Sequence, residues 1–236
     1  MNLKKDVTIL IPTRFNSRYM IELCLESVKK YTDYPHKIIV GDAGVDEETR
    51  VFLESRKDIK LVTPDNASLP KDSMIKYVDT HCFLFLHDDT QVLKRGWLDR
   101  RVALMERDQR NAIVGVVVAN FVYGWKRYFL YKKSMRRFWP LVLLVKTEAQ
   151  HELNLHWGVT GDFDTGGMAY NQFMSQSKYR FVSCNFKDDV KHFGGMTWPL
   201  KKKVQNEAVK FNIDTVVSER DVRLETIKKI LESKRY

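Results

Sequence analysis

Short apolar runs that alternate with amphipathic segments are the feature that most constrains the fold of this chain. Residues 7–11 (VTILI) form an apolar run that ends at Pro12, and residues 20–31 then place apolar side chains at the spacing of a helix. Further strand-like or helix-like segments follow at 37–40, 47–56, 59–62, 73–78, 83–86, 97–106, 112–119 and 179–184. Strands that alternate with helices over short connections are typical of parallel sheets covered on both faces. The sequence therefore predicts an α/β fold.

Polar side chains follow three of the predicted strands at the point where each strand ends. They are Thr13 and Arg14 after the first strand, Asp42 after the second, and His87, Asp88 and Asp89 after the fourth. In open α/β sheets, ligands bind outside the carboxyl ends of the strands. We therefore expect these side chains to meet at one edge of the sheet.

The His87-Asp88-Asp89 sequence places an imidazole and two carboxylates at one strand end. Oxygen-rich sites hold Mg²⁺ or Mn²⁺, and a nitrogen ligand favours Mn²⁺ or another transition metal. Such an ion offsets the repulsion between carboxylates and supports the departure of a phosphate leaving group. An ordinary polar turn that binds no metal is the alternative.

Size and charge limit the choice of function less sharply. A chain of 236 residues with 44% hydrophobic residues suits one sizeable domain, or one domain with a small appendage. Its 40 basic and 30 acidic residues give a net charge of +10, which favours anionic partners such as nucleotides, phosphorylated sugars, nucleic acid or acidic lipid. A basic surface that only faces solvent is equally compatible with this charge.

The cysteines and the apolar runs indicate a cytoplasmic protein. Cys24, Cys82 and Cys184 are few and dispersed, as expected for reduced thiols rather than for a disulfide framework or a zinc site. The apolar residues before Pro12 are too few for a signal peptide, and the longest apolar run, near 138–145, is too short to span a membrane. Peripheral attachment to the inner face of a membrane is left open.

Three segments in the second half differ in character from the strands and helices before them. Residues 121–145 interleave aromatic and basic side chains, which would suit a phosphorylated acceptor, an anionic membrane, a subunit contact or a solvated helix with a buried aromatic face. Residues 158–170 (GVTGDFDTGGMAY) are rich in glycine and acids. The tail from Lys201 is charged and has an amphipathic pattern that predicts a helix.

Five segments together resemble family 2 glycosyltransferases with the GT-A fold. They are VTILIPTRFNSRYMIELCLESV, KIIVGDAG, CFLFLHDDTQVLKRGWLDRRVALME, AIVGVVVA and VKHFGGMTW, which span roughly residues 7–198. Each motif is short, and their order and spacing carry the resemblance. It implies a Rossmann-like, mixed but mostly parallel sheet flanked by helices. The implied domain covers residues 1–200, with a nucleotide-binding half (1–110) and an acceptor half (111–200), before a helical extension (201–236).

The resemblance also implies roles for individual residues. Pro12, Thr13 and Arg14 would line the nucleotide pocket, Asp42 would accept a hydrogen bond from the base, Lys71 would touch the nucleotide, and Asp88 would face the donor sugar or ribose. Asp89 matches the last acid of the DxD motif and His192 matches a late histidine, so both would bind the metal. His87 stands where the first acid of the motif usually lies, and it would either bind the metal or only donate a hydrogen bond.

An inverting transfer needs one general base to take the proton of the acceptor hydroxyl. By the resemblance, Asp164 is the first candidate and Asp162 the second. The acidic pair that often follows in the family falls at Asn171 and Gln172, whose amides cannot act as bases at neutral pH. The alternative is that Asp164 only caps a turn before Gly166.

The resemblance implies a hexosyltransferase-like enzyme that moves a sugar from a nucleotide-diphosphate donor, expected to be a UDP-sugar, with Mn²⁺ or Mg²⁺. The acceptor would be a glycan, a lipid-linked or phosphorylated molecule or another hydroxyl compound, in polysaccharide biosynthesis, and a homo-oligomer is left open. A nucleotidyltransferase is a weaker alternative, because the segment after the first strand (PTRFNSRYM) lacks that class's glycine-rich loop. Nucleic acid is not expected, since no RNA-binding platform motif is present. A degenerate protein that binds nucleotide sugars without turnover stays open.

Overall fold

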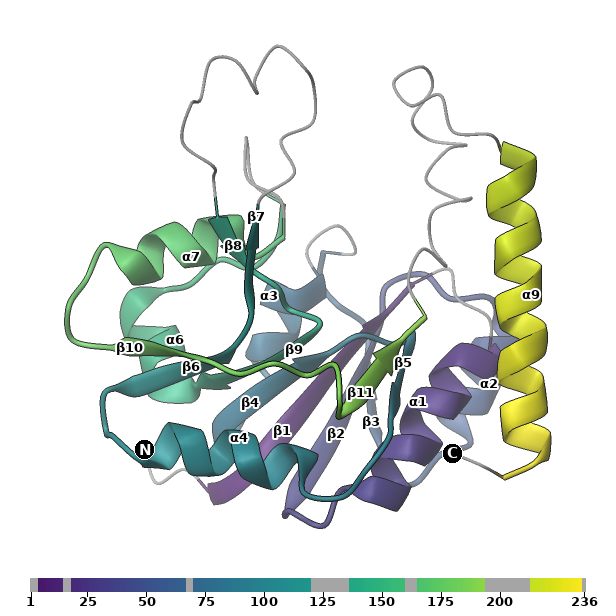
Figure 1. Ribbon diagram of the computed structural model, residues 1–236, viewed down its shortest axis with the longest axis horizontal. Helices are drawn as coiled ribbons and strands as arrows, with labels where there is room; N and C mark the ends of the chain where they lie inside the picture. The colour runs from purple at the N-terminus through teal and green to yellow at the C-terminus, as the bar shows by residue number, and fades with distance from the viewer. Residues whose placement is uncertain are drawn as a thin grey trace.

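The structure is a computed structural model, and it describes residues 4–14, 18–66, 70–119, 136–159, 165–193 and 213–234. Its core is a seven-stranded sheet with the strand order β10-β6-β9-β4-β1-β2-β3 (Figure 1). The strands are β1 (Lys4–Thr13), β2 (His36–Asp42), β3 (Lys60–Val62), β4 (Thr80–Leu86), β6 (Asn111–Gly115), β9 (Val142–Lys146) and β10 (Arg180–Ser183). Strand β9 runs antiparallel to both neighbours and every other pairing is parallel. The predicted mixed, mostly parallel sheet is therefore confirmed.

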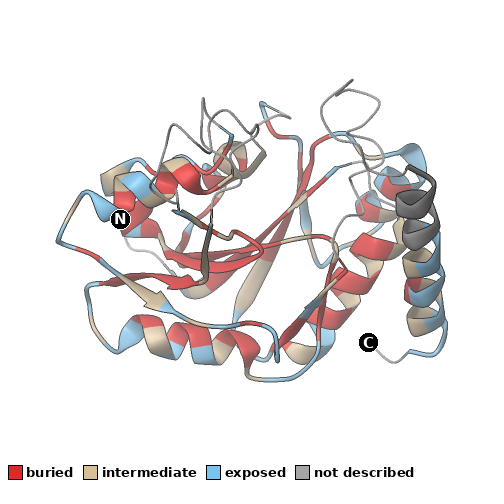
Figure 2. Ribbon diagram, turned by 45° about the horizontal axis from the view of Figure 1, so that its top comes forward, coloured by how far each residue is buried: buried red, intermediate tan, exposed pale blue. Residues whose placement is uncertain are grey.

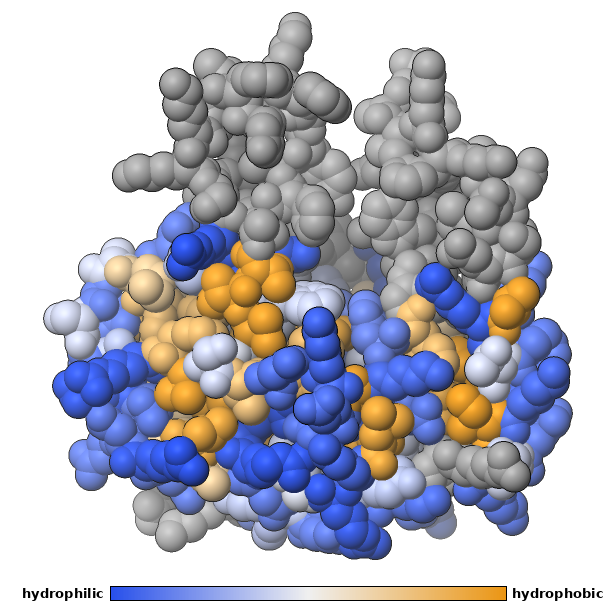
Figure 3. All heavy atoms as spheres, in the orientation of Figure 1, coloured by the Kyte–Doolittle hydropathy of each residue, from blue (hydrophilic) through white to orange (hydrophobic). Residues whose placement is uncertain are grey.

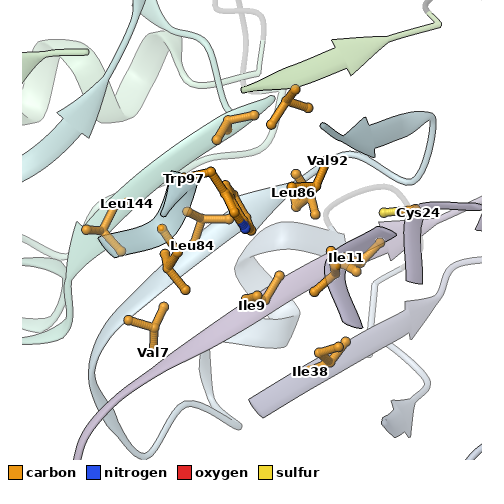
Figure 4. Close-up of a cluster of buried hydrophobic side chains, with 14 of the residues drawn as sticks. Val7, Ile9, Ile11, Cys24, Ile38, Leu84, Leu86, Val92, Trp97 and Leu144 are labelled. Carbon is orange, nitrogen blue, oxygen red and sulfur yellow. The ribbon is translucent and has the colours of Figure 1, made fainter. Parts of the chain in front are cut away.

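Helices cover both faces of this sheet. They are α1 (Arg18–Tyr31), α2 (Glu47–Glu54), α3 (Pro70–Ile75), α4 (Trp97–Glu106), α6 (Thr147–Leu153) and α7 (Gly167–Met174). Alternate residues of β1 point to opposite faces: Ile9 packs in a cluster with side chains of α1, α2 and α4 (Figure 4), whereas Leu10 packs with α3, α6 and α7. Because both faces are covered, the central strands carry mostly apolar side chains on both faces, and Figure 2 shows these strands as largely buried.

Two small antiparallel sheets lie beside the main one. The first pairs β5 (Thr90–Val92) with β11 (Val190–His192), and the second pairs β7 (Val117–Ala119) with β8 (Arg136–Phe138). The apolar run at 112–119 is thus two strands, β6 and β7, that belong to different sheets. The chain leaves the main sheet at Val116, whose carbonyl accepts a hydrogen bond from the Trp139 N–H at 2.9 Å.

Other element boundaries also differ from those predicted. The third helix begins at Pro70, not at residue 73, because proline suits the first helical position, where no N–H is needed. Strand β9 lies at the end of residues 121–145, the basic and aromatic stretch for which no strand was predicted. Residues 121–135 of that stretch lie outside the described residues. Helices α6 and α7 were not predicted.

The predicted C-terminal helix is present as α9 (Ile213–Glu232), which lies beside α1 (Figure 1). The helices described by the structure include none that is long and apolar enough to cross a membrane. Exposed large apolar side chains are scattered over separate elements, at Val51, Leu93, Val159, Met174 and Val222. The face shown in Figure 3 is accordingly hydrophilic over most of its described surface, with small apolar areas between.

Candidate active site

Strand register brings the predicted nucleotide-binding residues of β1 and β2 to one edge of the sheet. Thr13 is the register partner of Asp42, and the Ala43 N–H donates to the Thr13 carbonyl at 2.9 Å. Strand β4 lies on the other side of β1 in parallel register, so Leu86 ends at the same edge. The side chains after all three strands therefore start from one rim.

Asp42 is held firmly in the loop that follows β2. Its Oδ1 accepts hydrogen bonds from the Gly44 and Val45 N–H groups at 2.9 and 3.0 Å, and its Oδ2 pairs with Arg50 at 3.1 Å. Gly44 has a φ of 108°, a conformation that favours glycine. A carboxylate has about four lone-pair sites, so Asp42 keeps capacity to accept a further hydrogen bond from a ligand.

The other predicted nucleotide-binding residues differ in exposure. Thr13 and Asp88 are buried, Pro12 and Lys71 are half-buried, and Arg14 is exposed. The Thr13 hydroxyl is buried and finds no hydrogen-bond partner within the described part of the chain. Buried polar groups normally have a partner, so this hydroxyl is a candidate contact for a bound ligand.

The turn after β4 is fixed by backbone contacts on both sides. The His87 N–H donates to the Leu141 carbonyl at 3.1 Å, and the His87 carbonyl accepts from the Thr90 hydroxyl at 2.6 Å. The buried Cys24 thiol also approaches this carbonyl, at 3.6 Å. These contacts set the position of Asp89, which lies between the turn and β5.

Strand β11 brings His192 to the same turn. His192 is the register partner of Thr90, and the next N–H, that of Phe193, donates to the Asp89 carbonyl at 2.9 Å. The Asp89 Oδ1 lies 3.2 Å from His192 Nε2 and 3.8 Å from His87 Nδ1. One potential ligand atom from each of these three residues lies within 4.8 Å of the others. The predicted ligands thus form one cluster.

The charges in this cluster suit a divalent cation. Burial, together with the positive charge of Lys71, lowers the pKa of His87 to about 3, so its ring is neutral with a free lone pair at physiological pH. Burial raises the pKa of Asp89, but the neighbouring His192 and His87 rings outweigh it and the net shift is downward. Neutral imidazole and ionised carboxylate are the states that bind metal.

Two acceptor atoms in the cluster lack hydrogen bonds. His87 Nε2 and Asp89 Oδ1 are buried, and neither makes a hydrogen bond of acceptable geometry to the residues that the structure describes. Leaving a buried acceptor such as Asp89 Oδ1 unsatisfied costs about 1–3 kcal/mol, which a bound ion would recover. Mixed nitrogen and oxygen donors of this kind can hold a divalent transition metal.

The fold and this rim of polar residues agree with the family match. Residues 8–182 match the family model described as glycosyl transferase family 2. The chain belongs to glycosyl transferase family 2. The predicted family and the glycosyltransferase class are therefore confirmed. The protein is assigned to the glycosyltransferases and not to the nucleotidyltransferases. His192 lies beyond the matched residues.

Solved structures with a similar fold include a mannosyltransferase. The mannosyltransferase PcManGT from Pyrobaculum calidifontis, in complex with GDP-Man and Mn²⁺, is 16% identical, with a TM-score of 0.58 over 98% of this chain and 75% of that one. GalNAc-T7 with UDP, GalNAc and Mn²⁺ is 13% identical, with a TM-score of 0.56 over 81% and 44%. TarS (1–349) from S. aureus is 13% identical, with a TM-score of 0.51 over 91% and 70%. The comparison with curated proteins finds no match.

Both candidate bases of this family 2 glycosyltransferase, Asp162 and Asp164, lie outside the described residues. The chain on either side of them is well anchored. The Trp157 and Gly158 N–H groups donate to Asp72 at 2.7 and 2.9 Å, and the Gly166 N–H donates to the Trp157 carbonyl at 2.9 Å. The segment therefore leaves and re-enters the described chain at neighbouring points.

Sequence analysis missed two residues that anchor the ends of this segment. Arg137 donates to the Thr165 carbonyl at 3.2 Å, and its charge contributes to the lowered pKa of His87. Asp72 clamps the other end of the segment. The only available signals were a basic residue in an aromatic stretch and an acid in the first turn of a helix, and neither is specific.

Proposed function

We propose that this glycosyltransferase moves a sugar from a UDP-sugar to a hydroxyl acceptor with inversion, using Mn²⁺ held by His87, Asp89 and His192. The observation that carries the proposal is the convergence of these three side chains at the rim where β1, β2 and β4 end. Bound there, the ion would neutralise the diphosphate leaving group of the donor. Mg²⁺ is the alternative ion.

In this proposal, different residues around the cluster bind different parts of the nucleotide sugar. At the nucleoside end, beside Pro12 and Arg14, the Asp42 carboxylate accepts a hydrogen bond and the Thr13 hydroxyl donates one. Lys71 pairs with a phosphate. Asp88, buried next to the metal ligand Asp89, faces the ribose or the donor sugar. A carboxylate such as Asp42 accepts a hydrogen bond from uracil or from guanine, so the UDP preference rests on the resemblance in sequence.

Catalysis requires a base on the acceptor side. We assign this role to Asp164, with Asp162 as second choice, because Thr165 and Gly158 on either side are anchored by Arg137 and Asp72. The acceptor in this proposal is a glycan or a phosphorylated or lipid-linked hydroxyl compound in polysaccharide biosynthesis. The reaction takes place in the cytoplasm or at the inner face of a membrane.

Nucleotide titration with and without metal tests the proposal. We expect UDP to bind at least about tenfold more tightly with Mn²⁺ than in EDTA, because the ion bridges carboxylate and diphosphate. Calorimetry with UDP, GDP and dTDP in parallel gives the base preference. Binding that is indifferent to metal for every nucleotide contradicts the metal assignment, whereas tighter binding of GDP changes only the donor.

Replacing the proposed base is expected to slow transfer without weakening donor binding. Asp164→Asn should lower kcat about a hundredfold, since an amide cannot take the acceptor proton. Asp162→Asn serves as the matched control and should have a smaller effect. A larger loss in Asp162→Asn would exchange the two assignments.

A catalytically degenerate nucleotide-sugar-binding protein is the second candidate, and one observation favours it. Gln172, at the place where the family often has an acid, makes structural hydrogen bonds with both ends of its amide: it accepts from the His156 N–H at 2.9 Å and donates to the Asn154 carbonyl at 3.0 Å. Its amide holds the loop after α6 and does not act as a base. Metal-dependent nucleotide binding with no transfer or donor hydrolysis across a donor screen would establish this candidate.

A further inference from the structure

Phe193 connects the C-terminal helix α9 to the metal cluster. Its N–H donates to the Asp89 carbonyl at 2.9 Å, and its carbonyl accepts from the Arg223 guanidinium, also at 2.9 Å. Its ring is 8% exposed and belongs to a small apolar cluster with Met20 and Leu23 of α1 and Ile227 of α9. One residue thus contacts a metal ligand's backbone, α1 and α9.

The position of Phe193 matters because it is the residue that directly follows His192. Strand β11 has three residues, and His192 is the last of them. The other end of β11 is held firmly, because Asp189 pairs with the buried Arg101 at 2.9 Å and its carbonyl accepts from the Leu93 N–H at 2.8 Å. At the His192 end, the described contacts that follow the strand are those of Phe193.

The side chains of α9 that hold Phe193 come from one face of that helix. Arg223 and Ile227 are four residues apart, so they lie on the same face, and Ile227 is completely buried. Residues on the opposite face, such as Val222, are exposed. All of α9 lies outside the residues that match the family model.

We propose that α9 is a working part of the metal site: Arg223 and Ile227 are positioning residues that fix His192 through Phe193. The inference rests on the proposed function, because it requires His192 to bind the metal. Without the Arg223 hydrogen bond and the Ile227 contact, His192 would spend less time facing Asp89, and metal affinity would fall. Mutating a group that hydrogen-bonds a metal ligand directly typically changes metal affinity by 10- to 100-fold. Arg223 and Ile227 contact the residue after the ligand, so we expect their replacement to have a smaller effect.

The test measures Mn²⁺ binding to the full-length chain, without nucleotide, from the electron paramagnetic resonance signal of free Mn²⁺. Arg223→Met removes the donor and keeps an unbranched stem, and we expect the Kd for Mn²⁺ to rise roughly five- to tenfold. Lys229→Met removes the same charge from an exposed position of α9 and should leave the Kd unchanged. Equal Kd values for the two variants would overturn the proposal.

A double-mutant cycle distinguishes positioning from a general loss of order. His192→Ala should weaken Mn²⁺ binding, and in that background Arg223→Met should have no further effect, because there is no imidazole left to position. A full further loss in the double variant would overturn the proposal. If the wild-type chain binds no Mn²⁺, or if His192→Ala binds it as tightly as the wild type, then the proposed metal site fails first and this inference fails with it.

Ile227→Val is a second variant that tests the proposal, and it keeps the helix intact. It removes one methylene from the apolar cluster around Phe193 and should raise the Kd for Mn²⁺ about two- to threefold. Circular dichroism shows whether each variant is folded at the temperature of the titration. A folded Ile227→Val variant with wild-type affinity would count against the role of this contact, whatever the behaviour of Arg223→Met.

Discussion

Replacing Asp89 by asparagine is expected to lower kcat/KM for sugar transfer about a thousandfold, which corresponds to about 4 kcal/mol of transition-state stabilisation. The reason is electrostatic. Asp89 is the one anionic group in a cluster whose other two ligands are imidazoles, and both lie within 4 Å of its Oδ1. An amide has the same shape but no charge, so the site loses the attraction that holds a divalent cation beside the two imidazoles.

The control for this variant lies at the opposite end of the same strand. Asp79 directly precedes β4, is 56% exposed in its side chain, and pairs with Lys37 at 2.7 Å. Asp79→Asn removes a carboxylate far from the rim and should change activity less than twofold, because exposed ion pairs contribute little. We expect Asp89→Asn to recover part of its activity at high Mn²⁺ concentration. An Asp89→Asn enzyme with wild-type activity and unchanged metal dependence would contradict the assignment of Asp89 as a ligand.

The sequence was sufficient to predict most of the strands that are buried on both faces. Strands β1, β2 and β4 contain short apolar runs, and each was predicted within about three residues of its observed bounds, whereas the strand predicted at 112–119 combines β6 and β7. Strand β9 was missed although it lies at the centre of the sheet, because its apolar run continues from a basic and aromatic stretch. Periodicity alone does not separate a buried strand from a buried helix in a run of this kind.

The candidate site was predictable where it depends on strand ends and not where it depends on long-range pairing. Asp89 follows a strong strand signal, and the parallel order then places it at the rim. His192 ends a strand of three residues, which has no periodicity to detect, and only the resemblance to a family indicated it. The contacts of Arg137 and Phe193 join segments far apart in the chain, so no local pattern could have indicated them.

The buried ion pair between Arg101 and Asp189 is a further feature that sequence could not reveal, and its loss should have a large effect on stability. Arg101 is completely buried in α4, and its Nη1 donates to Asp189 Oδ2 at 2.9 Å and to the Trp97 carbonyl at 2.5 Å. Asp189→Asn keeps the shape but leaves the guanidinium charge without its carboxylate. Removing one partner of a buried pair costs about 3–5 kcal/mol, and we expect about 3 kcal/mol because the amide oxygen still accepts a hydrogen bond. Thermal unfolding should show this as a fall in Tm of about 6–12 °C.

Arg100 provides the matched control, and pH provides a second test. Arg100 also pairs with Asp189, at 2.5 Å, but its side chain is 49% exposed, so Arg100→Met should cost less than about 1 kcal/mol.

Burial raises the pKa of Asp189, but the hydrogen bond and charge of Arg101 and the charge of Arg100 outweigh it and hold the pKa below its ordinary value of 3.8. The ion pair therefore stabilises the fold above that value, and its contribution is lost as the pH falls below it toward the lowered pKa. The difference in unfolding free energy between wild type and Asp189→Asn should accordingly be constant from about pH 5 to 7 and should narrow below about pH 4. A difference that stays constant down to pH 2, or an Arg100→Met variant as unstable as Asp189→Asn, would show that the buried pair is not the source of the stability.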